Sequence, residues 1–299
     1  MTSVERLQPQ FDEVVDAGAE LRQVATGMAF TEGPVWHPSQ QCVLFTDIPN
    51  NHIIRWSEAE GLSTHVQNSH FAIGLYLDTD ERLLACEHST KRITRYEQDG
   101  TLTTLASHHG EAILNSTNDV CVRSDGAIFF TDPPFGVRLE EGQLAGYQVG
   151  SEYDGCYVFK VTDDPTSPQV VTDAIYRPNG LCFSLDEKTL FVSDSSERYH
   201  QVYALDMQAD DMAVNPRVFA TLPSGVPDGL RIDTDGRLYV AGPDGVYVYD
   251  ADGEHLGKLL VPEMVTNICF GGSERQTLFI TAVSSLYAID LKTTGVQHP

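Results

Sequence analysis

The sequence predicts an all-β, six-bladed β-propeller whose ring is closed by a strand near the N-terminus. A two-part signature occurs six times along the 299 residues, with a nearly constant offset of 14 or 15 positions between equivalent residues of its two parts. A third segment of alternating apolar and polar residues follows each pair, as expected for a half-buried strand. Repeating units of several short strands are typical of propeller blades, and ring closure leaves no exposed sheet edges.

The first part of the signature has the form x-(N/D/E)-(G/D)-apolar-x-apolar, and we expect it to form the innermost strand of each blade. It reads TEGPVW, AIGLYL, TNDVCV, PNGLCF, PDGLRI and TNICFG, at residues 31–36, 72–77, 117–122, 178–183, 227–232 and 266–271. The second part reads CVLFTD, RLLACE, AIFFTD, TLFVSD, RLYVAG and TLFITA, at residues 42–47, 82–87, 127–132, 189–194, 237–242 and 277–282. Connecting segments such as SDGA and TDGR contain the Asp and Gly residues of tight hairpins.

Each unit continues into a third strand and, more weakly, a fourth. The third segments are HIIRW, RITRY, CYVFK, QVYAL, GVYVY and SLYAI, and the fourth are STHV, LTTL, PQVV, RVFA and GKLL. The sixth unit has no fourth segment, whereas LRQVAT at 21–26 precedes the first unit and belongs to no other. We therefore expect residues 21–26 to pair near Ser285–Ile289. Residues 1–299 are predicted to form one domain, with 1–20 as an N-terminal extension.

The amino-acid composition disfavours some classes of binding partner. With 19 Lys+Arg against 43 Asp+Glu, the formal charge is −24, which disfavours binding to nucleic acid or to anionic membranes. No apolar run reaches the ~18–20 residues of a membrane span, and the first twenty residues lack the apolar core of a signal peptide. The six cysteines are scattered without a CxxC pair. We expect a reduced, cytoplasmic protein that is a monomer or a small homo-oligomer.

The repeat also locates a candidate metal site. One residue starts the innermost strand of each blade, and in a propeller these starts converge around the central channel. They are Glu32, Ile73, Asn118, Asn179, Asp228 and Asn267. Five offer side-chain oxygen and none offers sulfur or imidazole, which favours a hard cation, Ca²⁺ first and Mg²⁺ or Mn²⁺ second. The alternative is ordinary turn chemistry, in which each Asn or Asp satisfies its own backbone. Five equivalent positions around one axis favour one divalent ion, balanced by the two carboxylates.

The loops between the second and third strands should open on the same end as these residues. In blade 3 this loop runs from Pro133 to Gly155, and we expect it to act as a lid that shapes substrate access, the alternative being an idle insertion. The acids that end the second segments should hold turn backbone near this mouth; they are Asp47, Glu87, Asp132 and Asp194. His88 begins such a loop and is a candidate substrate contact, although a solvated imidazole is the simpler expectation.

Four segments together resemble one known family. TEGPVW, LNSTNDVCVRSDGAIFFTDPPFG, RPNGLCFSLDEKTLFVSD and VPDGL are similar to the senescence marker protein/gluconolactonase (regucalcin-like) family, and CEHSTKRITR at 86–95 resembles its bacterial gluconolactonase branch. The resemblance extends from about Gly27 over the rest of the chain. It implies a six-bladed propeller with a divalent metal, Ca²⁺ or Zn²⁺, in the channel. The implied ligands are Glu32, Asn179 and Asp228, with Asn118 as a fourth ligand or a substrate contact.

The chain departs from the family pattern at two positions. Ile73 stands where many bacterial relatives have Asn, and Ser116, a second candidate substrate contact, stands where animal members carry Arg. The substrate preference of those members therefore does not carry over.

The leading hypothesis is metal-dependent hydrolysis of a sugar lactone such as glucono-1,5-lactone. The metal would polarise the carbonyl, and Asp228 would act as general base or as nucleophile. The sequence contains no Walker or Rossmann glycine loop and no GxSxG motif, which disfavours nucleotide-binding enzymes and nucleophile-elbow hydrolases. Two alternatives stay open: a phosphotriesterase or fluorophosphatase-like hydrolase, and a non-enzymatic calcium-binding or protein-binding propeller.

Overall fold

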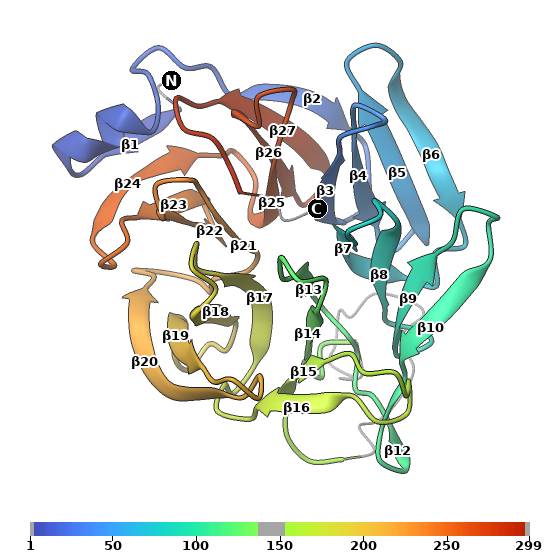
Figure 1. Cartoon of the computed structure of the whole chain (residues 1–299). Coiled ribbons are helices and arrows are strands. Elements are labelled where there is room, and N and C mark those ends of the chain that lie inside the picture. Colours follow the sequence, from blue (N-terminus) through green and yellow to red (C-terminus); the bar gives the residue numbers. More distant parts are fainter. Residues whose placement is uncertain (1–2, 137–152, 297–299) are drawn as a thin grey trace.

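The computed structural model describes residues 3–136 and 153–296, which form six blades around a central axis (Figure 1). This arrangement confirms the predicted all-β propeller. The innermost strands coincide with the first part of the repeat: β3 (Thr31–His37), β7 (Ala72–Leu77), β13 (Val120–Val122), β17 (Pro178–Phe183), β21 (Leu230–Ile232) and β25 (Val265–Gly271). The second strands coincide with its second part: β4 (Cys42–Asp47), β8 (Leu83–Glu87), β14 (Ile128–Asp132), β18 (Thr189–Asp194), β22 (Leu238–Gly242) and β26 (Thr277–Ala282).

The outer half of each blade is also antiparallel. The third strands are β5 (His52–Ser57), β9 (Arg92–Tyr96), β15 (Tyr157–Lys160), β19 (Gln201–Met207), β23 (Gly245–Tyr249) and β27 (Ser285–Asp290). The outer strands are β6 (Gly61–Gln67), β10 (Leu102–Ala106), β16 (Gln169–Thr172), β20 (Ala213–Thr221) and β24 (His255–Leu260). A short ribbon of β11 (His108–His109) and β12 (Ala112–Ile113) lies between blades 2 and 3 in the chain.

The ring closes as the sequence predicts. The strand β2 (Arg22–Thr26) pairs with β27 and completes blade 6, with Arg22 opposite Ala288 and Thr26 opposite Ser285. The Arg22 side chain also donates to Asp290 at 3.1 Å. Because β2 and the last strand of the chain, β27, belong to one sheet, opening the ring would require the pairing between them to break.

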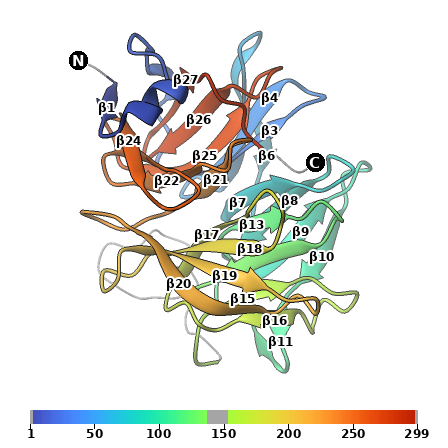
Figure 2. The same cartoon turned by 60° about the vertical axis from the view of Figure 1, so that its left-hand side comes forward.

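The residues before β2 lie over blades 5 and 6. The strand β1 (Val4–Arg6) adds a fifth strand to blade 5 along β24, and a 3₁₀ helix, η1 (Pro9–Glu13), follows it (Figure 2). Phe11, Val14 and Val15 are fully buried there. No part of residues 3–136 or 153–296 forms a helix with the length and apolar character that a membrane span requires.

Apolar side chains from neighbouring blades form the core between them. Trp36 on β3 stacks on Phe279 of β26, with ring centroids 5.8 Å apart, and so joins blade 1 to blade 6. All six cysteines are free thiols, and all but Cys156 are buried, as small apolar residues often are. Near the C-terminus, the Val296 N–H donates to the carbonyl of Ile232, the last residue of β21, at 3.0 Å.

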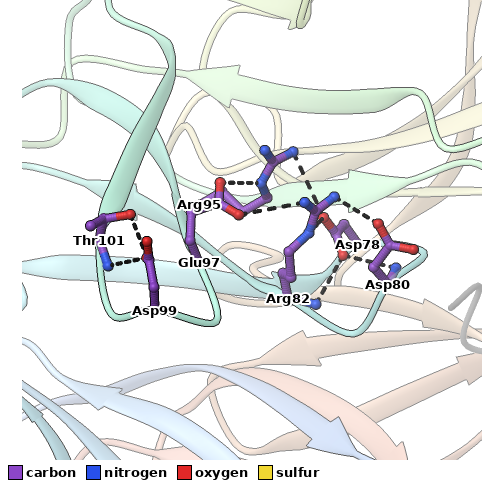
Figure 3. Close-up of polar contacts among 7 residues, drawn as sticks. All are labelled: Asp78, Asp80, Arg82, Arg95, Glu97, Asp99 and Thr101. Carbon is purple, nitrogen blue, oxygen red and sulfur yellow. Dashed lines mark hydrogen bonds and ion pairs between the residues drawn. The ribbon is translucent and has the colours of Figure 1, made fainter.

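Polar turns between strands are tied by ion pairs. In blade 2, Arg82 donates to Asp78 at 2.8 Å and lies 2.9 Å from Asp80, while Arg95 donates to Glu97 at 2.8 Å (Figure 3). Both of these arginines thus have carboxylate partners.

Candidate functional site

Hydroxyl groups of the second strands hold the predicted ring residues in place. Thr46 of blade 1 donates to the Ile73 carbonyl at 3.1 Å, Thr131 of blade 3 to Asn179 at 2.8 Å, and Ser193 of blade 4 to Asp228 at 2.8 Å. Each bond joins one blade to the ring residue of the next. The Thr or Ser that precedes the last acid of the second strand therefore fixes the distance between neighbouring innermost strands.

The glycine after the ring residue permits this close approach. A Cβ on Gly74 would lie 2.4 Å from the Asn118 carbonyl oxygen, and a Cβ on Gly180 would lie 2.4 Å from that of Asp228. Any larger residue at either position would push neighbouring inner strands apart. The recurring Gly of the signature is thus a condition for the ring residues to converge.

Glu32 is buried at the start of β3. Its Oε2 accepts hydrogen bonds from the Gly33 N–H at 2.7 Å and from the Asn267 amide at 3.1 Å. Burial raises the pKa of Glu32 to about 7, the Asp119 carboxylate adds to the rise, and the two hydrogen bonds oppose it. The carboxylate can therefore act as an oxygen ligand, and the groups around it do not fully offset the cost of burying its negative charge.

Asp228 lies beside Glu32 and Asn179. Among the described residues, its buried Oδ1 has no hydrogen-bond partner. Burial raises the pKa of Asp228 well above its usual range, the nearby Glu32 and Asp119 carboxylates raise it further, and the Asn179 side chain opposes the rise. The structure thus places three of the four predicted ligands, Glu32, Asn179 and Asp228, beside one another.

The fourth predicted ligand, Asn118, is anchored in the same ring by its backbone. Its N–H donates to the Thr131 carbonyl and its carbonyl accepts from the Gly74 N–H, both at 2.9 Å. The side chain is buried, at 4% exposure. Its contact with a metal or substrate stays a prediction.

The donor set fits a hard divalent cation. Among the described residues, no three His, Cys, Asp or Glu side chains are grouped closely enough to hold a metal, so a site here must combine the two carboxylates with amide oxygens. Such mixed oxygen sets suit Ca²⁺. A cation would supply the missing partner of Asp228 Oδ1 and offset the repulsion between Glu32 and Asp228.

Sequence reasoning missed a buried ion pair next to these carboxylates. Arg231 Nη1 lies 3.9 Å from Asp119 Oδ2, and the guanidinium carbon lies 5.5 Å from the centroid of the Tyr76 ring. Both charged residues are buried, and Arg231 opposes the rise that burial causes in the pKa of Asp119. The sequence does hint at this pair, because Asp119 in TNDVCV and Arg231 in PDGLRI are charged residues within segments expected to form buried inner strands.

The two other predicted substrate contacts are both buried in this structure. Ser116 donates to the Pro133 carbonyl and accepts from the Gly136 N–H, both at 2.8 Å, so its hydroxyl anchors the start of the blade 3 loop. His88 is 3% exposed, and burial lowers its pKa to about 3. The expectation of a solvated imidazole is wrong, because the fold packs this side chain inside. Substrate contact by either residue stays a prediction.

Three of the four acids at the ends of the second strands hold backbone, as expected, and Asp194 does so through the Ser196 N–H at 3.0 Å. Glu87 differs, because it accepts from the side chains of Thr90, Arg92 and Thr94. Asp47 accepts from the N–H groups of Ala29 and Phe30 at 3.1 and 3.2 Å. Asp132 accepts from the Asn115 N–H at 2.7 Å and from the Tyr153 hydroxyl, and burial raises its pKa to about 6. These bonds fix both described ends of the 133–155 loop. Its predicted action as a lid concerns residues 137–152, which lie outside the described residues.

Comparison with known proteins gives consistent matches along the chain. A gluconolactonase from Zymomonas mobilis is 26% identical over 98% of this chain and 87% of its own length. A pentonolactonase from Haloferax volcanii is 29% identical over 87% of this chain and 84% of its own. The solved structure of a gluconolactonase from Xanthomonas campestris superposes with a TM-score of 0.89 at 32% identity, covering 96% of this chain and 94% of that one. The model of the SMP-30/Gluconolactonase/LRE-like region matches residues 30–284, and the chain belongs to this family.

Proposed function

We propose that the protein is a lactonase that opens the ring of a sugar lactone with the help of one divalent metal ion, Ca²⁺ in the first place. Glu32, Asn179 and Asp228 would hold the ion, with Asn118 as a further ligand or a substrate contact. The observation that carries the proposal is the pair of neighbouring carboxylates of Glu32 and Asp228, one of which has a buried oxygen without a hydrogen-bond partner among the described residues. Family membership and relatives named for lactone hydrolysis support the reaction class.

The residues divide the chemistry between them. When bound, the cation would keep both carboxylates ionised, polarise the lactone carbonyl and stabilise the developing oxyanion. The Asn179 side chain lies beside Asp228 and favours its ionised form. Asp228 Oδ1 accepts no hydrogen bond from the described part of the chain. This oxygen can therefore take a proton from the attacking water as a general base, or attack the carbonyl as a nucleophile.

Glu32 has a different role. Its Oε2 accepts hydrogen bonds from Gly33 and Asn267, which hold the carboxylate in one orientation. We assign it to ion binding and leave the proton transfer to Asp228.

Acid release on ring opening tests the proposal. A panel of sugar lactones and one phosphotriester is assayed with a pH indicator, with Ca²⁺ and with a chelator. We expect hydrolysis of at least one sugar lactone, abolished by chelation and restored by the ion. Hydrolysis of the phosphotriester alone, or lactone hydrolysis that survives complete chelation, would contradict the proposal.

A further inference from the structure

Two arginines of blade 4 lie at the same end of the channel as the proposed site. Arg177 precedes β17 and is two residues before Asn179, and Arg198 is in the loop between β18 and β19. This loop is held against the ring: the Ser195 N–H donates to the Arg177 carbonyl at 3.0 Å, and the Ser195 hydroxyl donates to the carbonyl of Pro227, the residue before Asp228.

Arg177 also lies toward blade 3. Burial raises the pKa of Cys156 to about 11, Asp132 adds to the rise, and the positive charge of Arg177 opposes it. Cys156 directly precedes β15 of blade 3, so the Arg177 side chain lies near the border of blades 3 and 4, two residues along the chain from the ring residue Asn179. A group at this place can meet a substrate bound at the ring.

Within residues 3–136 and 153–296, neither guanidinium group has a carboxylate partner. Neither makes an ion pair or a hydrogen bond there, whereas arginines elsewhere on the molecule do, as Arg82 and Arg95 illustrate (Figure 3). In a chain with 43 acidic residues and only 19 Lys and Arg, two such arginines at one end of a blade form an exception. Their charge is not neutralised by the described part of the chain and can meet a ligand.

Aromatic rings orient these arginines without neutralising them. The guanidinium carbon of Arg177 lies 5.7 Å from the Tyr176 ring centroid, and that of Arg198 lies 5.0 Å from the Tyr199 centroid. The two rings meet edge to face, with centroids 6.2 Å apart and planes at 82°. Tyr176 is 54% exposed. Cation–π contacts of this kind hold a guanidinium in place and leave its N–H donors free.

We propose that Arg177 and Arg198 recognise an anionic substituent of the substrate, so that the site takes sugar lactones carrying a carboxylate or a phosphate at the end remote from the lactone carbonyl. This inference rests on the lactonase function proposed above. Arginine matches both anions through paired N–H donors, and the exposed face of Tyr176 can pack against the C–H groups of a sugar.

The test compares selectivity rather than activity alone. The kcat/KM values of 6-phosphoglucono-lactone, a glucaro-lactone and neutral glucono-1,5-lactone are measured for the wild type, Arg177→Gln, Arg198→Gln and the double variant. The control is Arg217→Gln, because Arg217 is an exposed residue of β20 paired with Asp206.

We expect the wild type to prefer at least one anionic lactone over the neutral one by about tenfold or more, as charged hydrogen bonds allow. The double variant should lose that ratio and the control should keep it. The phosphate and carboxylate arms show which anion is preferred.

The results can contradict the anion site without contradicting the proposed lactonase function. Hydrolysis of lactones without anion preference, or with a preference that survives both substitutions, overturns the anion site and leaves the lactonase intact. If no lactone is hydrolysed, calorimetry with 6-phosphogluconate and glucarate on the metal-free protein decides. Binding that the double variant weakens supports the anion site, and absence of binding overturns it.

Discussion

The Asn267 amide donates to the Glu32 carboxylate at 3.1 Å and so joins the innermost strands of blades 6 and 1 at the point where the ring closes. The same amide opposes the rise that burial causes in the pKa of Asp119. Its position in the repeat is that of a candidate ligand, yet its amide nitrogen is bound to the Glu32 carboxylate. We therefore expect Asn267 to affect metal binding through the orientation it imposes on Glu32.

Replacing Asn267 with Ala should weaken Ca²⁺ binding about tenfold or more while the fold persists, since loss of a group that orients a ligand has effects of this size. Calorimetric titration of Ca²⁺ measures the change. Asn215→Ala is the matched control, because Asn215 pairs with Asp206 at 3.2 Å on an exposed outer strand. An unchanged Ca²⁺ affinity in Asn267→Ala would remove this role.

The metal-free protein should lose stability as the pH rises. The pKa of Glu32 is raised from 4.5 to about 7 by burial, so the folded state favours the protonated acid. Its contribution is fully present below pH 4.5 and is lost between pH 4.5 and about 7. Melting temperatures in chelator should fall across this range, and Glu32→Gln should fall less. Saturating Ca²⁺ should raise Tm most at the high end. A Tm profile identical in wild type and Glu32→Gln would contradict this assignment.

The buried pair of Arg231 and Asp119 should stabilise the fold only as a pair. Arg231→Met leaves Asp119 buried without its countercharge and should cost about 3–5 kcal/mol in the free energy of unfolding. The double variant with Asp119→Asn should lose less than the sum of the single changes, as urea unfolding can show. Arg217→Met, at an exposed pair, should cost about 1 kcal/mol or less. Strict additivity would show that the two charges do not interact.

Phe11 should stabilise the whole propeller although it precedes the first repeat. Its ring is fully buried beside blade 5, so Phe11→Ala should cost about 3–5 kcal/mol. Leu7→Ala, at a residue 49% exposed, is the control. Unfolding should remain one transition if the N-terminal residues belong to a single domain. A separate early transition that leaves the main one unshifted would contradict that prediction.

The blade pattern was readable because it is local. Each signature places a ring residue, a glycine and a hydroxyl at fixed spacing, so the convergence of Glu32, Asn179 and Asp228 follows from repetition alone. Closure by residues 21–26 was readable because the sixth unit lacks a strand.

Other features depend on contacts between distant segments. The pairing of Arg231 with Asp119 joins blades 5 and 3, and neither residue has a local pattern that announces the other. Ser116 and His88 lie where a loop meets a blade, so their burial depends on how the loop folds back. The strand Val4–Arg6 is too short to carry a periodicity. Sequence reasoning could propose these residues but not their surroundings.

Turnover by Asp228→Asn at saturating Ca²⁺ tests the central claim most directly. The substitution keeps an oxygen ligand and nearly the same volume but removes the charge and the proton acceptor, while Glu32 retains part of the ion affinity. Occupancy is verified by direct metal analysis before rates are compared. If Asp228 is the base or the nucleophile, kcat for the best lactone should fall by a factor of ~10² or more. A metal-loaded Asp228→Asn protein that turns over at close to the wild-type rate would contradict the mechanism and leave Asp228 as a ligand alone.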